Sequence, residues 1–457
     1  MTAIQRILCR VTVASLLALI PTGQQAMAGR LKVQEVTLAN GLKVLLVEEH
    51  KAPVITVQIW YKVGSRNEVM GRAGLSHMLE HMMFKGTPKY GKGAFSKMIE
   101  KNGGNDNAFT SQDYTAYFEN LAANKLELTL EMEADRMKGL LLDEKEFQLE
   151  REVVKEERRL RVEDVPMAYL VEQMYAQAFM VHPYHWPIIG WFNDLDAMTR
   201  EDLKAYYDKY YVPNNATLVI VGDVKAETAL PVIKKYFEGI PQGSLPAPPS
   251  IVEPVQKGER RIVVKREAQL PFIYFGYKVP NFESPDVHAL AVLENILSTG
   301  KSARLYDALV YREKLALQVG AGYNELATDP EFFTFYAIVK PGVKIADVEK
   351  AVLAEIERLK KEPPTEKELQ KAKNQVEARY LFEQDSVFRQ AMLLGTAETV
   401  GAGWQYIADY VDKLRGVTKE DVHRVARTYL NEDTRTVGIL IPLPAKSERA
   451  QAAGGAR

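Results

Sequence analysis

Short strand-like segments and longer amphipathic segments follow one another along the chain. The strand-like segments are rich in β-branched and aromatic residues, and Asn40-Gly41 between two of them is a typical hairpin turn. Three such segments are expected to form strands: residues 31–37, 43–48 and 53–62. Four segments with helical spacing of apolar positions are expected to form helices: residues 73–85, 95–102, 121–139 and 144–161. This mixture predicts an α+β fold in which helices pack on mainly antiparallel sheets.

The chain contains an internal repeat. The stretches beginning at Thr199 and at Thr418 both continue with an acidic pair, reach a tyrosine and end in an apolar run, and they lie 219 residues apart. A threonine before an acidic pair is typical of a helix N-terminus, and the apolar run is typical of a strand. The proline-rich segment 241–258 separates the two halves. We therefore expect two tandem homologous domains, at residues 29–240 and 259–443, joined by a linker at 241–258 and followed by a flexible tail at 444–457.

Residues 1–28 have the pattern of a secretory signal peptide. Arg6 and Arg10 precede the apolar run Val11–Ile20, and small residues precede the expected cleavage site between Ala28 and Gly29. A membrane anchor is the alternative, but the run is shorter than the roughly 20 residues that span a bilayer. The sequence therefore predicts export to a bacterial periplasm and no membrane anchor after cleavage.

Composition and charge narrow the possible chemistry. The 457 residues include 59 basic and 60 acidic side chains, and this balance gives no electrostatic basis for binding nucleic acid. Cys9 is the single cysteine, so an intramolecular disulfide and a cysteine-ligated metal site are both excluded. A metal ion would have to be held by carboxylates and by some of the seven histidines.

The segment His77-Met-Leu-Glu80-His81 is the strongest local signal for chemistry. On a helix, residues four apart are neighbours, so His77 and His81 can offer two imidazoles to one metal ion. Glu80 lies beside them, in the H-x-x-E-H arrangement of inverted zinc-peptidase motifs. A catalytic zinc needs three protein ligands and an open position for water, whose proton a carboxylate accepts. The alternative is that the two histidines simply pack near a core.

A third ligand is expected in the acidic stretch from Glu150 to Glu157. On one helix these two glutamates share a face with Val153 and Val154. Glu157 is therefore the candidate metal ligand, and Glu150 is the candidate carboxylate that holds a ligand histidine from behind. The alternative is an ordinary solvated charged face.

Several motifs together resemble the pitrilysin/insulinase family of zinc peptidases, which includes the mitochondrial processing peptidase and its bacterial relatives. The resemblance covers essentially the whole chain after residue 28. It is carried by the following segments: Gly74–Thr87, Asn107–Ser111, Glu133–Arg136, Glu150–Glu157, His182–Tyr184 and Tyr211–Asp223.

The resemblance implies an exported zinc endopeptidase that hydrolyses peptides or unfolded segments and binds one Zn²⁺ per chain. His77, His81 and Glu157 correspond to the zinc ligands, Glu80 to the general base and Glu150 to the supporting carboxylate. Asn107 and Ala108 correspond to the edge-strand segment that pairs with the backbone of an extended peptide substrate.

One segment departs from the pattern of active family members. Where these carry an Arg and, seven residues on, a Tyr that contact the substrate, this chain has Val310 and Leu317. Neither side chain can donate a hydrogen bond to a developing oxyanion. We therefore expect a heterodimer in which a homologous subunit supplies the Arg–Tyr pair, in preference to a symmetric homodimer. A non-catalytic scaffold subunit that keeps the fold is the alternative function.

Overall fold

The computed structural model describes residues 32–247 and 251–444. The predicted signal peptide, residues 248–250 of the predicted linker and all but the first residue of the predicted tail lie outside the described residues. In the described part of the chain, no helix has the length and apolar character needed to span a membrane.

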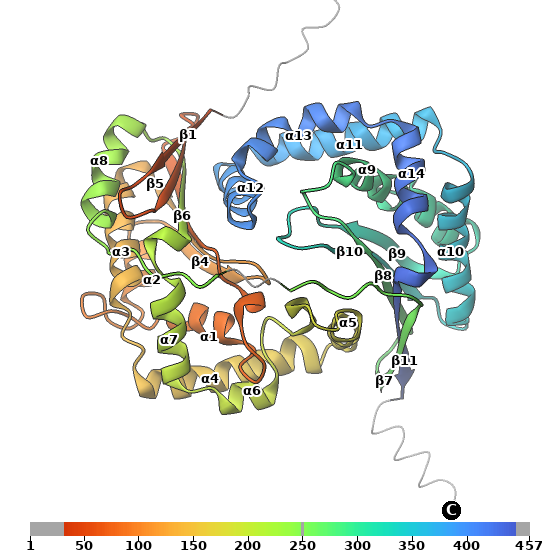
Figure 1. The fold of residues 1–457 in the computed structure, drawn as a ribbon, viewed down its shortest axis with the longest axis horizontal. Helices are drawn as coiled ribbons and strands as arrows, with labels where there is room; N and C mark the ends of the chain where they lie inside the picture. Colours follow the sequence, from red (N-terminus) through yellow and green to blue (C-terminus); the bar gives the residue numbers. More distant parts are fainter. Residues whose placement is uncertain (1–31, 248–250, 445–457) are drawn as a thin grey trace, which may run out of the picture. The chain divides into compact units, whose positions relative to one another are not determined.

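The first half of the described chain builds a six-stranded sheet in the order β1-β2-β6-β3-β5-β4 (Figure 1). Its strands are β1 (Val33–Thr37), β2 (Lys43–Glu48), β3 (Val54–Tyr61), β4 (Asn105–Thr110), β5 (Thr115–Ala122) and β6 (Ala216–Gly222). The helices of this half are α1 (Leu75–Met82), α2 (Ala94–Lys101), α3 (Leu126–Gly139), α4 (Glu144–Arg158), α5 (Pro166–Ala178), α6 (Phe192–Ala197), α7 (Arg200–Tyr210) and α8 (Ala226–Phe237). Apolar side chains of the sheet and of α1, α3, α4, α7 and α8 form one core.

The second half builds a five-stranded sheet in the order β7-β11-β8-β10-β9. Its strands are β7 (Arg260–Glu267), β8 (Phe272–Val279), β9 (Ala316–Tyr323), β10 (Glu331–Val339) and β11 (Arg435–Leu443). Its helices are α9 (Val287–Ser298), α10 (Ile345–Lys361), α11 (Glu366–Gln384), α12 (Val387–Val400), α13 (Trp404–Gly416) and α14 (Lys419–Tyr429).

The two sheets have the same topology once β1 is set aside. The order β2-β6-β3-β5-β4 matches β7-β11-β8-β10-β9, and in each sheet only the first pair is parallel. The preceding helices α7 and α14 begin with the same capping box, Thr199 with Asp202 and Thr418 with Asp421. The predicted α+β fold with two homologous domains is therefore confirmed.

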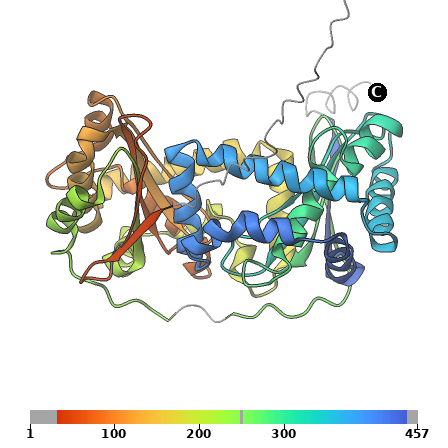
Figure 2. The same ribbon diagram turned by 90° about the horizontal axis from the view of Figure 1, so that it is seen from above.

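One helix of each half packs on the sheet of the other half. Helix α5, from the first half, packs on β11, β7 and β8, whereas α12, from the second half, packs on β6 and β3 (Figures 1 and 2). A glycine permits the close approach at each place. Gly395 of α12 lies against the Trp60 ring of β3, and Gly438 of β11 lies against Leu170 of α5.

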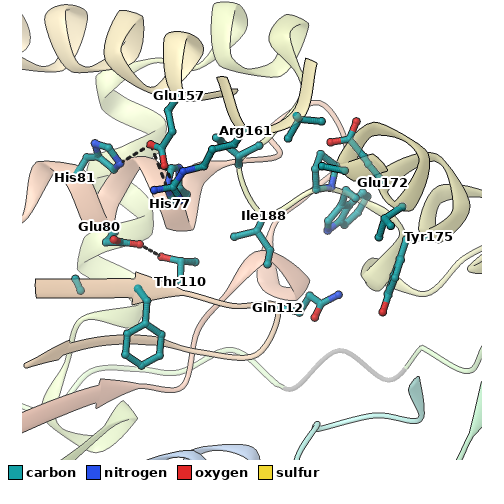
Figure 3. Close-up of a pocket in the computed structure, with 18 of the residues that line it drawn as sticks. His77, Glu80, His81, Thr110, Gln112, Glu157, Arg161, Glu172, Tyr175 and Ile188 are labelled. Carbon is teal, nitrogen blue, oxygen red and sulfur yellow. Dashed lines mark hydrogen bonds and ion pairs between the residues drawn. The ribbon is translucent and has the colours of Figure 1, made fainter. Parts of the chain in front are cut away.

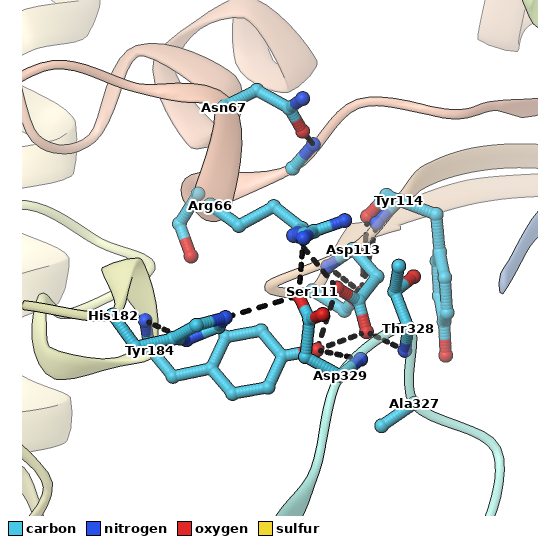
Figure 4. Close-up of polar contacts among 12 residues, drawn as sticks. Arg66, Asn67, Ser111, Asp113, Tyr114, His182, Tyr184, Ala327, Thr328 and Asp329 are labelled. Atoms are coloured by element: carbon cyan, nitrogen blue, oxygen red, sulfur yellow. Dashed lines mark hydrogen bonds and ion pairs between the residues drawn. The ribbon is translucent and has the colours of Figure 1, made fainter. Parts of the chain in front are cut away.

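A buried polar cluster also joins the two halves (Figure 4). Arg66 forms ion pairs with Asp329 and, at 3.5 Å, with Asp113. Tyr184 donates its hydroxyl proton to the Asp113 carboxylate, and His182 Nε2 lies 3.0 Å from the Asp329 carboxylate. Only Asp329 of these five residues comes from the second half. We refer to Arg66, Asp113, His182, Tyr184 and Asp329 as the interdomain cluster.

Two expected elements differ from the observed ones. The helix predicted over 121–139 begins only at Leu126, because β5 continues to Ala122 and a short 3₁₀ turn follows. The helix predicted over 144–161 is α-helical to Arg158 and then continues as a π-helical turn, Arg159–Glu163.

Candidate metal centre

Helix α1 places His77, Glu80 and His81 on one side of the hydrophobic core of the first half. Its N-cap, Gly74, has a left-handed backbone (φ 98°) and no capping side chain of its own. The buried carboxylate of Glu68 takes this role by accepting hydrogen bonds from the backbone N–H groups of Gly74 and Ser76, both at 2.7 Å. The N-terminus of α1 is therefore capped by a side chain that lies outside the helix.

Helix α4 brings the two candidate glutamates to α1. Its buried residues Phe147 and Val154 pack in the core, which turns Glu150 and Glu157 toward the histidines. The Oε2 atom of Glu157 lies 3.2 Å from His81 Nε2 and 3.7 Å from His77 Nε2 (Figure 3). The sequence prediction that Glu157 joins the histidine pair therefore agrees with this geometry.

Three ligand atoms, one each from His77, His81 and Glu157, lie within 4.8 Å of one another. Zinc bonds of about 2.0–2.2 Å in a tetrahedral site separate the ligand atoms by roughly 3.5 Å. The separations of 3.7 Å and 3.2 Å to Glu157 lie close to that value. Two imidazole nitrogens and a carboxylate oxygen are also a ligand set that zinc peptidases use. The residues present therefore fit a zinc ion.

Glu150 orients one of the two imidazoles. Its Oε1 lies 2.8 Å from His81 Nδ1, and its Oε2 pairs with Lys85. This contact leaves His81 Nε2 free to face Glu157, which is the usual function of a carboxylate behind a ligand histidine. The corresponding nitrogen of His77, Nδ1, is buried without a hydrogen-bond partner among the described residues.

Burial and neighbouring charges set the protonation of these groups. Burial, together with the neighbouring His81, lowers the pKa of His77 to about 4, which keeps this imidazole neutral and able to bind a metal. Burial lowers the pKa of His81 as well, but hydrogen bonds to Glu150 and Glu157 outweigh this and raise it to about 9. A metal ion at this position would replace that proton.

Glu80 lies between the histidine pair and the end of β4 (Figure 3). Its Oε2 accepts a hydrogen bond of 2.5 Å from Thr110 Oγ1 at the end of β4 (Figure 3). Burial raises the pKa of Glu80, and the hydrogen bond from Thr110 opposes this. A raised carboxylate pKa is suited to a group that accepts and returns a proton near neutral pH.

Asn107 and Ala108 lie in β4, the outermost strand of the first sheet. They pair with Phe118 and Tyr117 of β5, and β4 has no partner on its other side among the described strands. Both residues line the same pocket as the histidines. An extended peptide could add to this edge as a further strand.

The metal centre opens into a pocket of about 880 Å³. Its walls come mainly from the first half, with Tyr274 and Glu331 contributed by the second. Val310 and Leu317 are not among the described residues that line it. Val310 lies in a π-helical turn, Tyr306–Arg312, and Leu317 is half exposed on β9.

Four residues near the site were not singled out from the sequence. Thr110 bonds Glu80, Lys85 bonds Glu150, Arg161 bonds Glu157 and Glu68 caps α1. Arg161 lies four residues after Glu157, so helical spacing alone could have indicated it. The contact of Lys85 with Glu150 joins segments that are distant in the sequence. Nothing in the sequence places Glu68 or Thr110 beside α1, because both contacts arise from tertiary packing.

Comparison with known proteins identifies the family. The family model described as Insulinase (Peptidase family M16) matches residues 43–190, and the one described as Peptidase M16 inactive domain matches residues 197–376. The chain belongs to peptidase family M16. The predicted resemblance to the pitrilysin/insulinase family is therefore confirmed.

Relatives within family M16 extend along most of the chain. The zinc protease PqqE of Helicobacter pylori is 38% identical over 416 residues, which cover 90% of this chain and 93% of that protein. A crystal structure of a protease from H. pylori matches with a TM-score of 0.87 and 38% identity, covering 90% of this chain and 100% of that one. A crystal structure from Pseudomonas fluorescens, described as a peptidase M16 inactive domain, has 20% identity and a TM-score of 0.83, and covers 91% of this chain and 99% of that one. This last likeness concerns the fold alone.

Proposed function

We propose that this family M16 chain is an exported zinc-dependent endopeptidase that hydrolyses peptides or unfolded segments. The main support is the convergence of His77, His81 and Glu157 beside the half-buried carboxylate of Glu80 in one pocket. An open strand edge at Asn107 and Ala108 lines the same pocket, as a peptidase for extended chains requires.

In the proposed mechanism, each residue has a task that its position supports. His77, His81 and Glu157 hold one Zn²⁺, and Glu150 keeps His81 in its ligand orientation. When bound, zinc polarises a carbonyl group and lowers the pKa of water. Backbone groups of β4 align the peptide at Asn107 and Ala108. Glu80 accepts a proton from the attacking water and returns it to the leaving amine.

The test compares wild-type chain with a Glu80→Gln variant, each stripped of metal and reloaded with zinc. We expect both to bind one zinc ion per chain. The variant should lose about 10²- to 10⁴-fold in hydrolysis of an internally quenched peptide, because it lacks the proton acceptor. Equal activity of the two proteins, or no zinc-dependent hydrolysis by either when assayed alone and with the homologous subunit proposed below, would contradict the proposal. The second result would favour a scaffold function.

We also propose that a homologous subunit completes the site by supplying the Arg and Tyr that Val310 and Leu317 replace. The support is chemical: two aliphatic side chains cannot donate hydrogen bonds to an oxyanion, and one lost donor of this kind costs about 10²- to 10³-fold in rate. We expect the lone chain to be weakly active and a mixture with a homologue encoded by a neighbouring gene to be fully active. Full activity of the lone chain would rule out this requirement.

The proposed location is the bacterial periplasm, with the leader removed between Ala28 and Gly29. The support is the leader pattern of residues 1–28. The N-terminal sequence of the protein recovered from a periplasmic extract tests it, and a chain retaining Met1 in the cytoplasm would contradict it.

A further inference from the structure

Arg161 is a cationic residue of the metal centre that the proposed mechanism does not use. It lies on the π-helical turn Arg159–Glu163, and its Nη1 is 2.9 Å from Glu157 Oε1. The other oxygen of Glu157, Oε2, faces the histidines. The Arg161 side chain lines the pocket and is 73% exposed, and its guanidinium group lies beside Glu157 and His77 (Figure 3).

The guanidinium group of Arg161 can bind a second anion at little cost to its ion pair with Glu157. Ion pairs four residues apart on a helix contribute little to stability when one partner is well exposed, as Arg161 is, because solvent screens its charge. If Glu157 binds a divalent ion, its negative charge is neutralised by that ion. The guanidinium group, still beside Oε1, would then carry positive charge that the carboxylate no longer balances.

The other charged groups of the pocket already have partners. Lys85, the other lysine or arginine among the described lining residues, pairs with Glu150. At the far wall, Glu172 accepts hydrogen bonds of 2.9 Å from both terminal nitrogens of Arg158. Glu331 accepts a hydrogen bond from the Tyr175 hydroxyl at 2.9 Å, and its burial raises its pKa. An anion in the pocket would therefore meet little uncompensated negative charge at that wall.

We propose that Arg161 is a specificity residue that binds a carboxylate of the peptide close to the scissile bond. The planar guanidinium group matches a carboxylate with two parallel hydrogen bonds, which makes arginine the preferred residue for this recognition. The carboxylate belongs either to an Asp or Glu side chain or to the free C-terminus of a short peptide. This inference rests on the proposed peptidase function and names its substrate class.

Peptide sets that differ in one charge test this specificity. Quenched peptides carry Glu, Gln or Lys at each position flanking the cleaved bond, and each is made with a free and with an amidated C-terminus. For the wild-type zinc enzyme we expect kcat/KM to be about 10- to 100-fold higher for a peptide with the carboxylate than for its neutral counterpart. Arg161→Ala should remove this preference mainly by raising KM, Arg161→Glu should favour the Lys peptide, and Arg161→Lys should retain part of the preference.

Arg159→Ala is the matched control. Arg159 lies on the same turn but pairs with the exposed Glu156 at 2.7 Å and is absent from the described lining of the pocket. We expect the kinetics of Arg159→Ala to equal those of wild type. We also expect every variant to bind as much zinc as wild type. A preference lost with amidation identifies the C-terminus as the source of the carboxylate, whereas one that survives amidation identifies a side chain.

Two results would overturn the inference: no preference for a carboxylate in wild type, or an equal loss of kcat on every peptide in Arg161→Ala. A binding assay distinguishes failure of this inference from failure of the proposed peptidase function. Fluorescent peptides are titrated into the zinc-loaded Glu80→Gln protein with and without Arg161→Ala. Weaker binding of only the carboxylate peptides by the double variant supports the inference even if no hydrolysis is seen, and equal binding of all peptides contradicts it.

Discussion

The two halves of the molecule share a scaffold but differ at one helix. In the first half, α1 packs on α4, α7 and β4, and in the second, α9 packs on α11, α14 and β9. Helix α1 carries two histidines and a glutamate that face a pocket, whereas α9 is buried along almost its whole length by apolar side chains. The duplicated fold therefore does not by itself specify chemistry, which depends on a few polar residues of one copy.

The two helices also begin differently. The start of α1 is held by the Glu68 carboxylate through backbone N–H groups. The residue before α9, Asp286, instead binds the side chains of Arg424 and Tyr429, each at 2.7 Å. In the second half, the Asp286 carboxylate thus joins α9 to α14. In the first half, the Glu68 carboxylate fixes the N-terminus of α1, which carries the candidate ligands.

Replacement of Glu157 by Gln should have the largest effect. Mutation of a residue that supports a metal ligand lowers metal affinity by about 10- to 100-fold. We expect a larger fall in zinc affinity here, because a charged ligand itself is lost. Glu156→Gln, on the exposed side of α4, is the matched control and should bind zinc normally. Competition with a chelating dye measures both affinities, and equal affinities would mean that Glu157 is not a ligand.

Arg66→Ala tests the interdomain cluster that joins the halves. Removing the guanidinium leaves Asp113 buried without its cation, so we expect the free energy of unfolding to fall by about 3–5 kcal/mol. Arg72→Ala breaks a more exposed pair with Asp202 and should cost about 1 kcal/mol or less. Urea denaturation measures both, and similar small losses would show that the cluster does not hold the halves together.

Gly395→Ala tests the exchange of helices between the halves. A methyl group here would lie 2.1 Å from Trp60 Cε2, so we expect a loss of about 2–3 kcal/mol from overpacking. Gly416→Ala, at the end of α13, meets no atom within 4 Å and is the control. If both variants unfold at the wild-type urea concentration, α12 does not pack on β3 as described.

His288→Phe tests the contrast between α1 and α9 through pH. Burial and the charge of Lys413 lower the pKa of His288 to about 4, so this imidazole is neutral when folded. The unfolded chain takes up the proton first, and wild-type stability should fall as pH drops from about 6.5 to 4. Phe keeps the stacking on Tyr406 without titrating, and should reduce this loss by about 2–3 kcal/mol. Identical pH profiles of urea midpoints would contradict the lowered pKa of the folded His288.

The sequence predicted the parts of the site that depend on local spacing. The pairing of His77 with His81 and the shared face of Glu150 and Glu157 follow from helical periodicity. The same reasoning placed Val153 beside them, but Val153 is 51% exposed and only Val154 is buried. Neighbouring residues on a helix point about 100° apart, so one of the two had to leave the face.

The contacts between distant segments could not be predicted in this way. Apolar periodicity in α5 and α12 shows that each buries a face, but it does not say against which sheet. The exchange depends on the small residues Gly395 and Gly438, whose partners lie hundreds of residues away. Arg66 and Asp329 are likewise 263 residues apart, and their pairing follows from the completed fold.

The central claim is the proposal that zinc binds at His77, His81 and Glu157 of the first half, the one candidate site found among the described residues. Zinc anomalous diffraction from crystals of the zinc-loaded chain tests it most directly. We expect a single peak per chain, about 2.0–2.2 Å from His77 Nε2, His81 Nε2 and a carboxylate oxygen of Glu157. No peak at these residues, or a peak of equal height in the second half, would contradict the claim.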